Sequence, residues 1–155
     1  MAMPANERYD DYLERRGAVT AAQARERFAS ARVARLATVG PGGRPHLVPI
    51  VFAVAGETIV HAVDHKPKRP GTLRRVRNIR HQPSVSVLAD AYDEDWTRLW
   101  WVRADGRARV LEPATAEAQA ALVPLVARYL PYAERPPQGP VIVVDVERWT
   151  GWEAV

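Results

Sequence analysis

Short runs rich in β-branched and aliphatic residues, separated by turn signals, dominate residues 33–64 of this chain. VARLATV (33–39) ends at GPGGRP, HLVPIVFAV (46–54) ends at Ala55-Gly56-Glu57, and TIVHAVD (58–64) follows. Such runs with Gly and Pro between them are typical of antiparallel strands joined by tight turns. We therefore expect a hairpin followed by a third strand in a meander. Pro49 cannot donate a ladder hydrogen bond, so it marks a sheet edge, a bulge or a backbone approach to a ligand.

The second half of the chain predicts further strands. SVSVLAD (84–90) alternates in polarity, and VIVVDVERW (141–149) is apolar on both faces near its start. WTRLWWVRAD (96–105) and RARVL (107–111) read as a hairpin around Asp105-Gly106. Trp100 and Trp101 are adjacent, so on a strand they face opposite sides, one toward the core and one toward a second surface.

Three segments predict helices. Thr20 and Gln23 form a capping-box pattern that opens a helix reaching about residue 31. A second helix covers 73–82, with Thr72 as its cap and Leu73, Val76 and Ile79 on its apolar face. A third covers 115–130 and is expected to bend at Pro124.

These elements together predict an α+β fold of mainly β type, a barrel of six or seven antiparallel strands decorated by helices. We expect a partly ordered segment at residues 1–19 and one domain at 20–155. The chain has no Cys, so disulfides and thiolate sites are excluded, which favours the cytoplasm. No apolar run reaches the ~20 residues of a membrane span, so no membrane partner is expected.

The stretch HKPKRPGTLRRVRNIRH (65–81) holds seven Lys and Arg and no acid, so the rest of the chain carries 15 basic against 18 acidic residues. Arg74, Arg75 and Arg77 leave the predicted helix near its N-terminus, where free N–H groups favour phosphate. A solvated basic helix face is the alternative. Nucleic acid is not expected, because no aromatic residue interrupts the run and no nucleic-acid motif occurs.

Other polar groups carry weaker signals. His61 and His65 lack the further ligands that a zinc site needs, and no metal site is expected. His46 and His61 are interpreted as packing residues, and contact with a ligand near Pro49 is the alternative for His46. The acidic residues of 90–95 lack calcium-loop spacing and are interpreted as a solvated turn or partners for arginines. No nucleophile motif or glycine-rich phosphate loop occurs, so an enzyme of this sequence would use a bound cofactor.

The order of RVARLATVGPGGRPHLVPIVFAV and LRRVRNIRHQPSVSVLAD resembles the pyridoxamine 5'-phosphate oxidase-like superfamily of split β-barrel flavoproteins. DHKPKR, LRRVRNI and YDEDWTRLWWVRADGRARV are similar to its branch that uses the deazaflavin coenzyme F-420. The resemblance covers about residues 20–150. Val48 and Ala53 stand where the oxidase proper has basic residues, and its C-terminal substrate motif is absent, so oxidation of pyridoxamine phosphate is not expected.

The resemblance implies a set of cofactor-binding residues. Arg74 and Arg75 would hold the cofactor phosphate, and Lys66 and Lys68 would reach a phosphate or an acidic tail. The ring system and its stem would lie along the second and third strands, at Val48, Pro49, Ile50, Val51, His61, Ala62 and Val63. No catalytic residue is assigned.

The resemblance also implies an activity and an assembly. The expected function is hydride transfer between coenzyme F-420 and an organic substrate by a homodimer with cofactors between its subunits. FMN binding by an oxidase or reductase of the same fold is one alternative. A non-enzymatic protein that binds a cofactor or haem is another.

Overall fold

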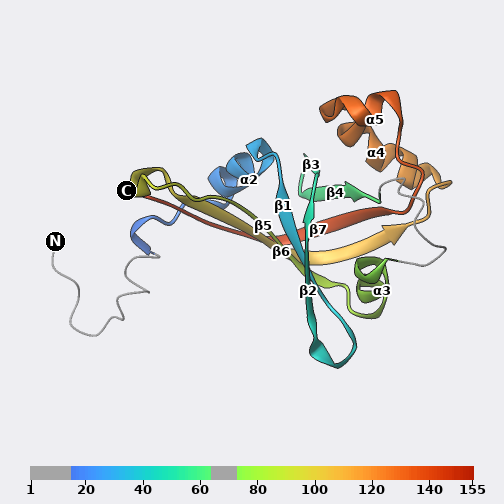
Figure 1. The fold of residues 1–155 in the computed structure, drawn as a ribbon, viewed down its shortest axis with the longest axis horizontal. Helices are drawn as coiled ribbons and strands as arrows, with labels where there is room; N and C mark the ends of the chain where they lie inside the picture. Colours follow the sequence, from blue (N-terminus) through green and yellow to red (C-terminus); the bar gives the residue numbers. More distant parts are fainter. Residues whose placement is uncertain (1–14, 64–72) are drawn as a thin grey trace.

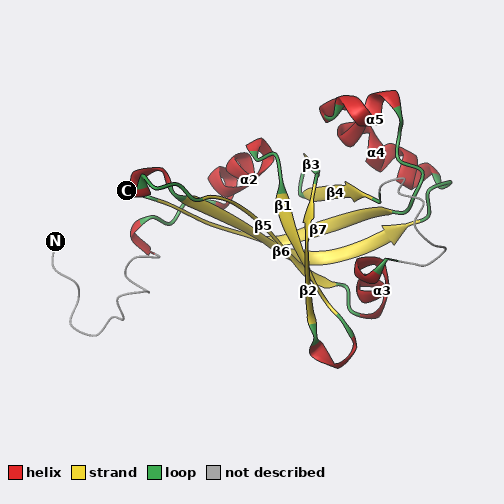
Figure 2. Cartoon of the chain, in the orientation of Figure 1, coloured by secondary structure: helices red, strands yellow, loops and turns green. Residues whose placement is uncertain are grey.

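A computed structural model describes residues 15–63 and 73–155 of the protein. Its seven strands are β1 (Ala34–Val39), β2 (Pro45–Ile50), β3 (Ala53–Ala55), β4 (Thr58–Ala62), β5 (Ser84–Ala91), β6 (Trp100–Leu111) and β7 (Val141–Glu153). Its helices are α2 (Ala21–Ser30), α3 (Arg74–His81), α4 (Ala116–Arg128) and α5 (Leu130–Glu134), with short 3-10 turns η1 (Pro41–Gly43) and η2 (Trp96–Arg98). Figure 2 shows the strands at the centre of the molecule and the helices around them.

The seven strands form one antiparallel sheet in the order β2-β1-β5-β6-β7-β4-β3. β2 and β3 therefore stand at opposite ends of this order, although only Val51 and Phe52 separate them in the chain. Two residues span at most about 7 Å, so the sheet must curl until its two edges meet. This confirms the expected α+β split barrel. In Figure 1, α3, α4 and α5 lie at one end of the molecule and the C-terminus lies at the other.

The crossover between the two edges is fixed by side chains from distant elements. The Tyr129 hydroxyl donates to the Phe52 carbonyl at 2.8 Å, and an Arg128 N–H donates to the same oxygen at 2.9 Å. The Arg128 guanidinium also lies 4.8 Å from the centre of the Phe52 ring. His61 contacts the Val51 carbonyl through Nδ1 at 3.0 Å. The C-terminal end of α4 and strand β4 thus hold the point where the barrel closes.

The core lies in two apolar clusters, one on each side of the barrel wall. In the larger cluster, Phe28 of α2 packs against Phe52 and Trp149, with ring centres 4.7 and 5.4 Å apart. In the smaller cluster, Leu122 and Leu125 of α4 cover β3, β4 and the start of β7. The Thr20 capping box expected from the sequence is present at the start of α2.

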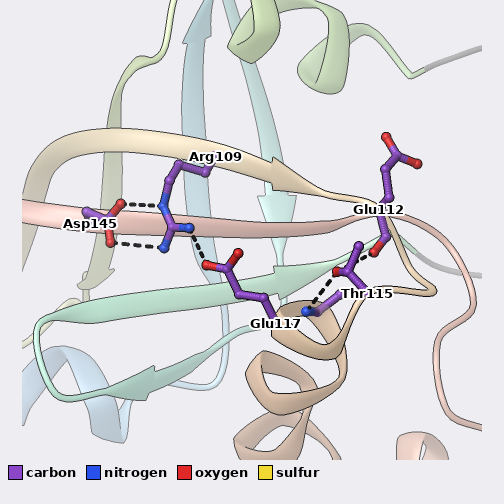
Figure 3. Close-up of polar contacts among 6 residues, drawn as sticks. Arg109, Glu112, Thr115, Glu117 and Asp145 are labelled. Carbon is purple, nitrogen blue, oxygen red and sulfur yellow. Dashed lines mark hydrogen bonds and ion pairs between the residues drawn. The ribbon is translucent and has the colours of Figure 1, made fainter.

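Helix α4 is tied to the sheet through Arg109 of β6. Its guanidinium donates to Asp145 of β7 at 2.7 Å and to Glu117 in the first turn of α4 at 2.5 Å (Figure 3). These carboxylates raise the pKa of Arg109. Thr115 caps the same helix, because its hydroxyl accepts from the Ala118 N–H at 3.2 Å. The helix therefore has a fixed position over the end of the barrel that carries α3.

Three sequence predictions about strands are wrong. The strand expected at 96–105 starts only at Trp100, because residues 96–98 form the turn η2, which is capped by Asp95. Residues 46–54 do not form one strand, since pairing with β1 ends at Ile50 and pairing with β4 starts at Ala53. Asp105-Gly106 is not a turn, because β6 runs through it with only a register shift against β7. A Cβ on Gly106 would strike the Asp145 carbonyl oxygen, so the glycine permits a close approach of β7. Residues 107–111, which were expected to form a separate strand of a hairpin, are the second half of β6.

Two other expectations, the edge position of Pro49 and the core contact of one tryptophan of the Trp100/Trp101 pair, are confirmed. Pro49 lies in β2, which is an edge strand of the sheet. A sheet edge is one of the three positions expected for this proline. Trp100 packs against the larger core cluster, whereas Trp101 pairs across the sheet with Asp90 and Trp152. In the described residues, no helix is long and apolar enough to cross a membrane.

Candidate functional site

The basic segment of the sequence contains helix α3. The helix starts at Arg74 with Leu73 as its N-cap, and no side chain caps it. Val76 and Ile79 are buried as expected, whereas Leu73 is 40% exposed and does not belong to the core. Lys66, Lys68 and Thr72 lie outside the described residues.

Arg74 and Arg75 point to different sides of the first turn of α3. Successive helical residues are about 100° apart around the axis, so neighbouring side chains diverge. Arg74 is exposed, whereas Arg75 is half-buried and its Nε is buried without a hydrogen-bond partner among the described residues. Burial also lowers the pKa of Arg75, although a guanidinium stays protonated. Arg75 is therefore a half-buried cation with one buried, unsatisfied N–H group.

His61 of β4 is the second buried polar group in this region. It is 5% exposed, its Nδ1 contacts the Val51 carbonyl, and its Nε2 is buried without a hydrogen-bond partner in the part of the chain that the structure describes. A carbonyl can only accept, so Nδ1 carries the proton and Nε2 presents a bare lone pair. Burial, followed by the charge of Arg75, lowers the pKa of His61 to about 4. The ring is neutral at physiological pH.

The two unsatisfied groups are complementary. Arg75 Nε–H is a donor and His61 Nε2 is an acceptor, and the charge of one acts on the other. A buried polar group without a partner costs roughly 1–3 kcal/mol, so a native protein is expected to supply a partner. A hydroxyl group can accept from the first and donate to the second. This region therefore fits the hydroxyl-bearing part of a ligand, or a water molecule.

Strand β2 provides an apolar edge beside these groups. Val48 and Val51 are half-buried and Pro49 is exposed. Ile50 is buried in the core, so its side chain cannot contact a ligand and only its backbone remains for that role. Among the described strands, β2 pairs only with β1, so its outer backbone edge forms no ladder hydrogen bonds and has donors and acceptors left for a ligand.

The end of β4 is less accessible than the sequence implied. Ala62 is 1% exposed and belongs to the smaller core cluster. Val63 is half-buried, packs against the larger cluster and donates its N–H to the Pro140 carbonyl at 3.0 Å. Of the three β4 residues assigned to the cofactor, His61 alone presents an unsatisfied polar atom.

A hollow of about 360 Å³ lies between α3 and the turn that joins β1 to β2. Its lining residues are Gly40, Pro41, Arg44, Pro45, His46, Arg74, Arg77 and Asn78. Partial burial, followed by the charges of Arg74 and Arg75, lowers the pKa of His46. His46 Nδ1 is buried without a partner. The first residues of β2 thus meet the start of α3 in a positively charged recess.

The sequence interpretation missed most of this hollow. His46 was expected to be a packing residue, and Arg44 and Asn78 were not singled out. Asn78 is buried and donates to the Thr38 hydroxyl at 3.0 Å, which holds α3 against β1. The available signal was Arg44, a cation directly after the Gly-Pro-Gly-Gly turn with no acid nearby in sequence.

The acidic residues near 90–95 serve arginines and backbone groups. Asp90 forms an ion pair with Arg35 at 2.7 Å, and Asp93 pairs with Arg98 at 3.5 Å. Asp95 accepts from the Thr97 N–H at 3.1 Å. Within residues 15–63 and 73–155, no group of three or more His, Asp and Glu side chains could hold a metal ion.

Comparison with known proteins gives one family and one fold. The pyridoxamine 5'-phosphate oxidase family matches residues 20–153. No curated protein matches the sequence. An FAD-binding protein from Mesorhizobium loti is 21% identical, with a TM-score of 0.67 over 89% of this chain and 97% of that chain. An FAD-binding protein from Mycobacterium smegmatis is 20% identical, with a TM-score of 0.60 over 87% of this chain and 95% of that chain. The haem storage protein HutZ from Vibrio cholerae is 17% identical, with a TM-score of 0.64 over 85% and 91%.

Proposed function

Because this chain belongs to the pyridoxamine 5'-phosphate oxidase family, we propose that it is an oxidoreductase that uses coenzyme F-420 for hydride transfer to or from an organic substrate. The observation that carries the proposal is the pair of buried, unsatisfied groups on Arg75 and His61 beside the open edge of β2. A suitable cofactor has three parts: a phosphate for Arg75, a hydroxylated stem for His61 and a flat ring for the edge of β2.

Each part of the site has a proposed role. Arg75 holds the phosphate through charge-assisted hydrogen bonds, and Arg74, which points to another side of the same helical turn, adds positive charge near it. The neutral His61 accepts a hydrogen bond from a stem hydroxyl through Nε2. The backbone of Val48, Pro49, Ile50 and Val51 lies against the ring.

The remaining assigned residues have supporting roles. Ala62 and Val63 form the packed end of β4 that keeps His61 in place. Lys66 and Lys68 are assigned to the acidic part of the cofactor on the sequence alone.

Bound deazaflavin supplies the carbon that gives or takes the hydride. The protein contributes binding, orientation and exclusion of water, as is usual for cofactor enzymes. The Val51 carbonyl is held by His61 and the Phe52 carbonyl by Tyr129, so the chain is held in place directly after β2, at the end of the segment proposed for the ring. A rigid edge fixes the distance between ring and substrate, which hydride transfer requires.

FMN is the second candidate cofactor, since two FAD-binding proteins share the fold. A phosphate, a polyol stem and a flat ring occur in FMN as well, so the same residues would hold it. A non-enzymatic haem protein is the third candidate, because a haem storage protein also shares the fold.

Fluorescence titration of the purified protein with coenzyme F-420, with FMN as competitor, tests the proposal. We expect saturable binding of F-420 that FMN displaces only weakly. Arg75→Ala should weaken binding about 10- to 100-fold, the usual value of a charged hydrogen bond. Arg80→Ala is the matched control, because Arg80 lies on the same helix but pairs with Glu112 at 2.8 Å.

Other outcomes select the alternatives. Tight FMN binding with no response to F-420 would favour the flavin enzyme. A Soret band after haem addition, with neither of the other cofactors bound, would favour the haem protein. Equal affinities of Arg75→Ala and the unmodified protein would refute the assignment of Arg75.

We also propose that the protein is a homodimer that uses the outer face of the sheet. Trp101 and Leu88 are half-buried on this face, and Leu47 is 65% exposed. Large apolar side chains on a sheet face usually mark an interface. Trp101→Glu should convert the dimer into a monomer, measured as molar mass by light scattering. A monomeric unmodified protein would refute this.

A further inference from the structure

The hollow between α3 and the β1–β2 turn carries positive charge without compensation. Arg44 comes from the turn, and Arg74 and Arg77 come from successive turns of α3. Among residues 15–63 and 73–155, no carboxylate lines the hollow and none of the three arginines forms an ion pair. A recess lined by charges of one sign concentrates the potential and attracts ions of the opposite sign.

The hollow also offers neutral hydrogen-bonding groups and sufficient space. His46 Nδ1 is buried without a partner at its wall, and Asn78 is fixed by its bond to Thr38. A water molecule occupies about 30 Å³ in the liquid, so about 360 Å³ accommodates an anionic group of several heavy atoms. Guanidinium groups bind phosphate and carboxylate through paired, charge-assisted hydrogen bonds.

This hollow is separate from the place assigned to the cofactor phosphate. Arg75 is not among the residues that line the hollow, although its charge acts on His46 as well as on His61. We propose that the hollow is a second anion subsite, which binds a phosphate or carboxylate group in addition to the one held by Arg75. The distinction from the first subsite rests on the proposed function, whereas the ability of the hollow to bind an anion does not.

Titration of the cofactor-free protein with inorganic phosphate, followed by NMR of the His46 ring protons, tests this subsite. A His46→Gln variant assigns the signal. We expect saturable shifts and a rise in the pKa of His46, because a bound anion stabilises the imidazolium. Arg44→Ala and Arg77→Ala should each weaken phosphate binding about 10-fold, the lower end of the range for a charged hydrogen bond. Arg80→Ala should change it by less than about twofold, since Arg80 lies outside the hollow.

Repeating the titration with saturating FMN, which has one phosphate, separates the two subsites. Phosphate that still binds supports the proposal, whereas displacement by FMN shows that the hollow is the cofactor's own phosphate site and overturns it. Displacement by coenzyme F-420 but not by FMN would identify the acidic end of the cofactor as the occupant. If phosphate binds in the presence of either cofactor, the natural occupant of the hollow is an anionic molecule other than the cofactor.

Failure of the proposed function and failure of the anion subsite give different results in these titrations. If no cofactor binds but phosphate does, the proposed function fails and the anion subsite stands. If phosphate produces no saturable shift, or binds equally well to Arg44→Ala and Arg77→Ala, the subsite is refuted whatever the cofactor result.

Discussion

The buried neutral His61 makes the stability of this protein depend on pH in a defined window. Its pKa is lowered from 6.5 to about 4 by burial and by the charge of Arg75. In the unfolded chain the imidazole regains its ordinary pKa near 6.5. Between these values the unfolded state binds more protons than the folded state, so stability falls as the pH falls.

The magnitude follows from the two pKa values. From about pH 7.5 to about pH 4.5, the linkage relation gives a loss of about 2.5 kcal/mol from His61 alone. The contribution is fully present above the unfolded pKa, is lost progressively below it, and stops changing below about pH 4. This is a large part of the 5–15 kcal/mol typical of a domain.

Urea unfolding followed by tryptophan fluorescence, at a series of pH values in buffers without phosphate, measures this effect. His61→Asn is the reference, since its amide N–H can replace Nδ1 at the Val51 carbonyl and does not titrate. Each protein gives a curve of the free energy of unfolding against pH. Subtracting the curve of His61→Asn from that of the unmodified protein removes the contribution of carboxylates and of the other histidines. The difference should change by about 2.5 kcal/mol across the window. Parallel curves would show that His61 is not held neutral and would refute the reasoning.

Three further substitutions test the packing that positions the site, by urea unfolding. Tyr129→Phe should destabilise the protein by about 1–2 kcal/mol, because the Phe52 carbonyl loses the hydroxyl donor; no change would refute the role of this bond. Gly106→Ala should cost about 3 kcal/mol because a methyl group there meets the Asp145 carbonyl, and a neutral result would mean that β7 moves away easily. Thr20→Ala should cost about 1 kcal/mol by loss of the α2 cap, and near-full rescue by Thr20→Ser but not by Thr20→Val would confirm that cause.

Local signals in the sequence predicted most elements but not how the distant ones meet. The Thr20 box and the alternating strands were recognisable because their causes lie within a few residues. The break after Ile50 was not, since the split depends on β1 and β4 pairing with different halves of one apolar run. Gly106 was taken for a turn because a glycine after an aspartate is a turn signal, whereas the neighbouring β7 explains it.

In the candidate site, too, the sequence indicated a single residue but not the contacts between distant segments. Arg75 was found from its place in a basic segment and from a family resemblance, and the structure adds that its Nε is buried and unsatisfied. The hollow around Arg44 and His46 was missed, since it joins a hairpin turn to a helix some 30 residues later. Residues that a fold brings together from separate turns leave no periodic signal in the chain.

The two-residue link between β2 and β3 also has a consequence for folding. Val51 and Phe52 can reach their final positions only after the five strands between β2 and β3 in the sheet are in register, including β7 at the end of the chain. Such distant pairings are slow to form, because long segments must be ordered first. We therefore expect the contacts of Arg128 and Tyr129 with the distant Phe52 carbonyl to form late. A ligand that binds there would bind only completed barrels, and would slow unfolding from the place that closes last.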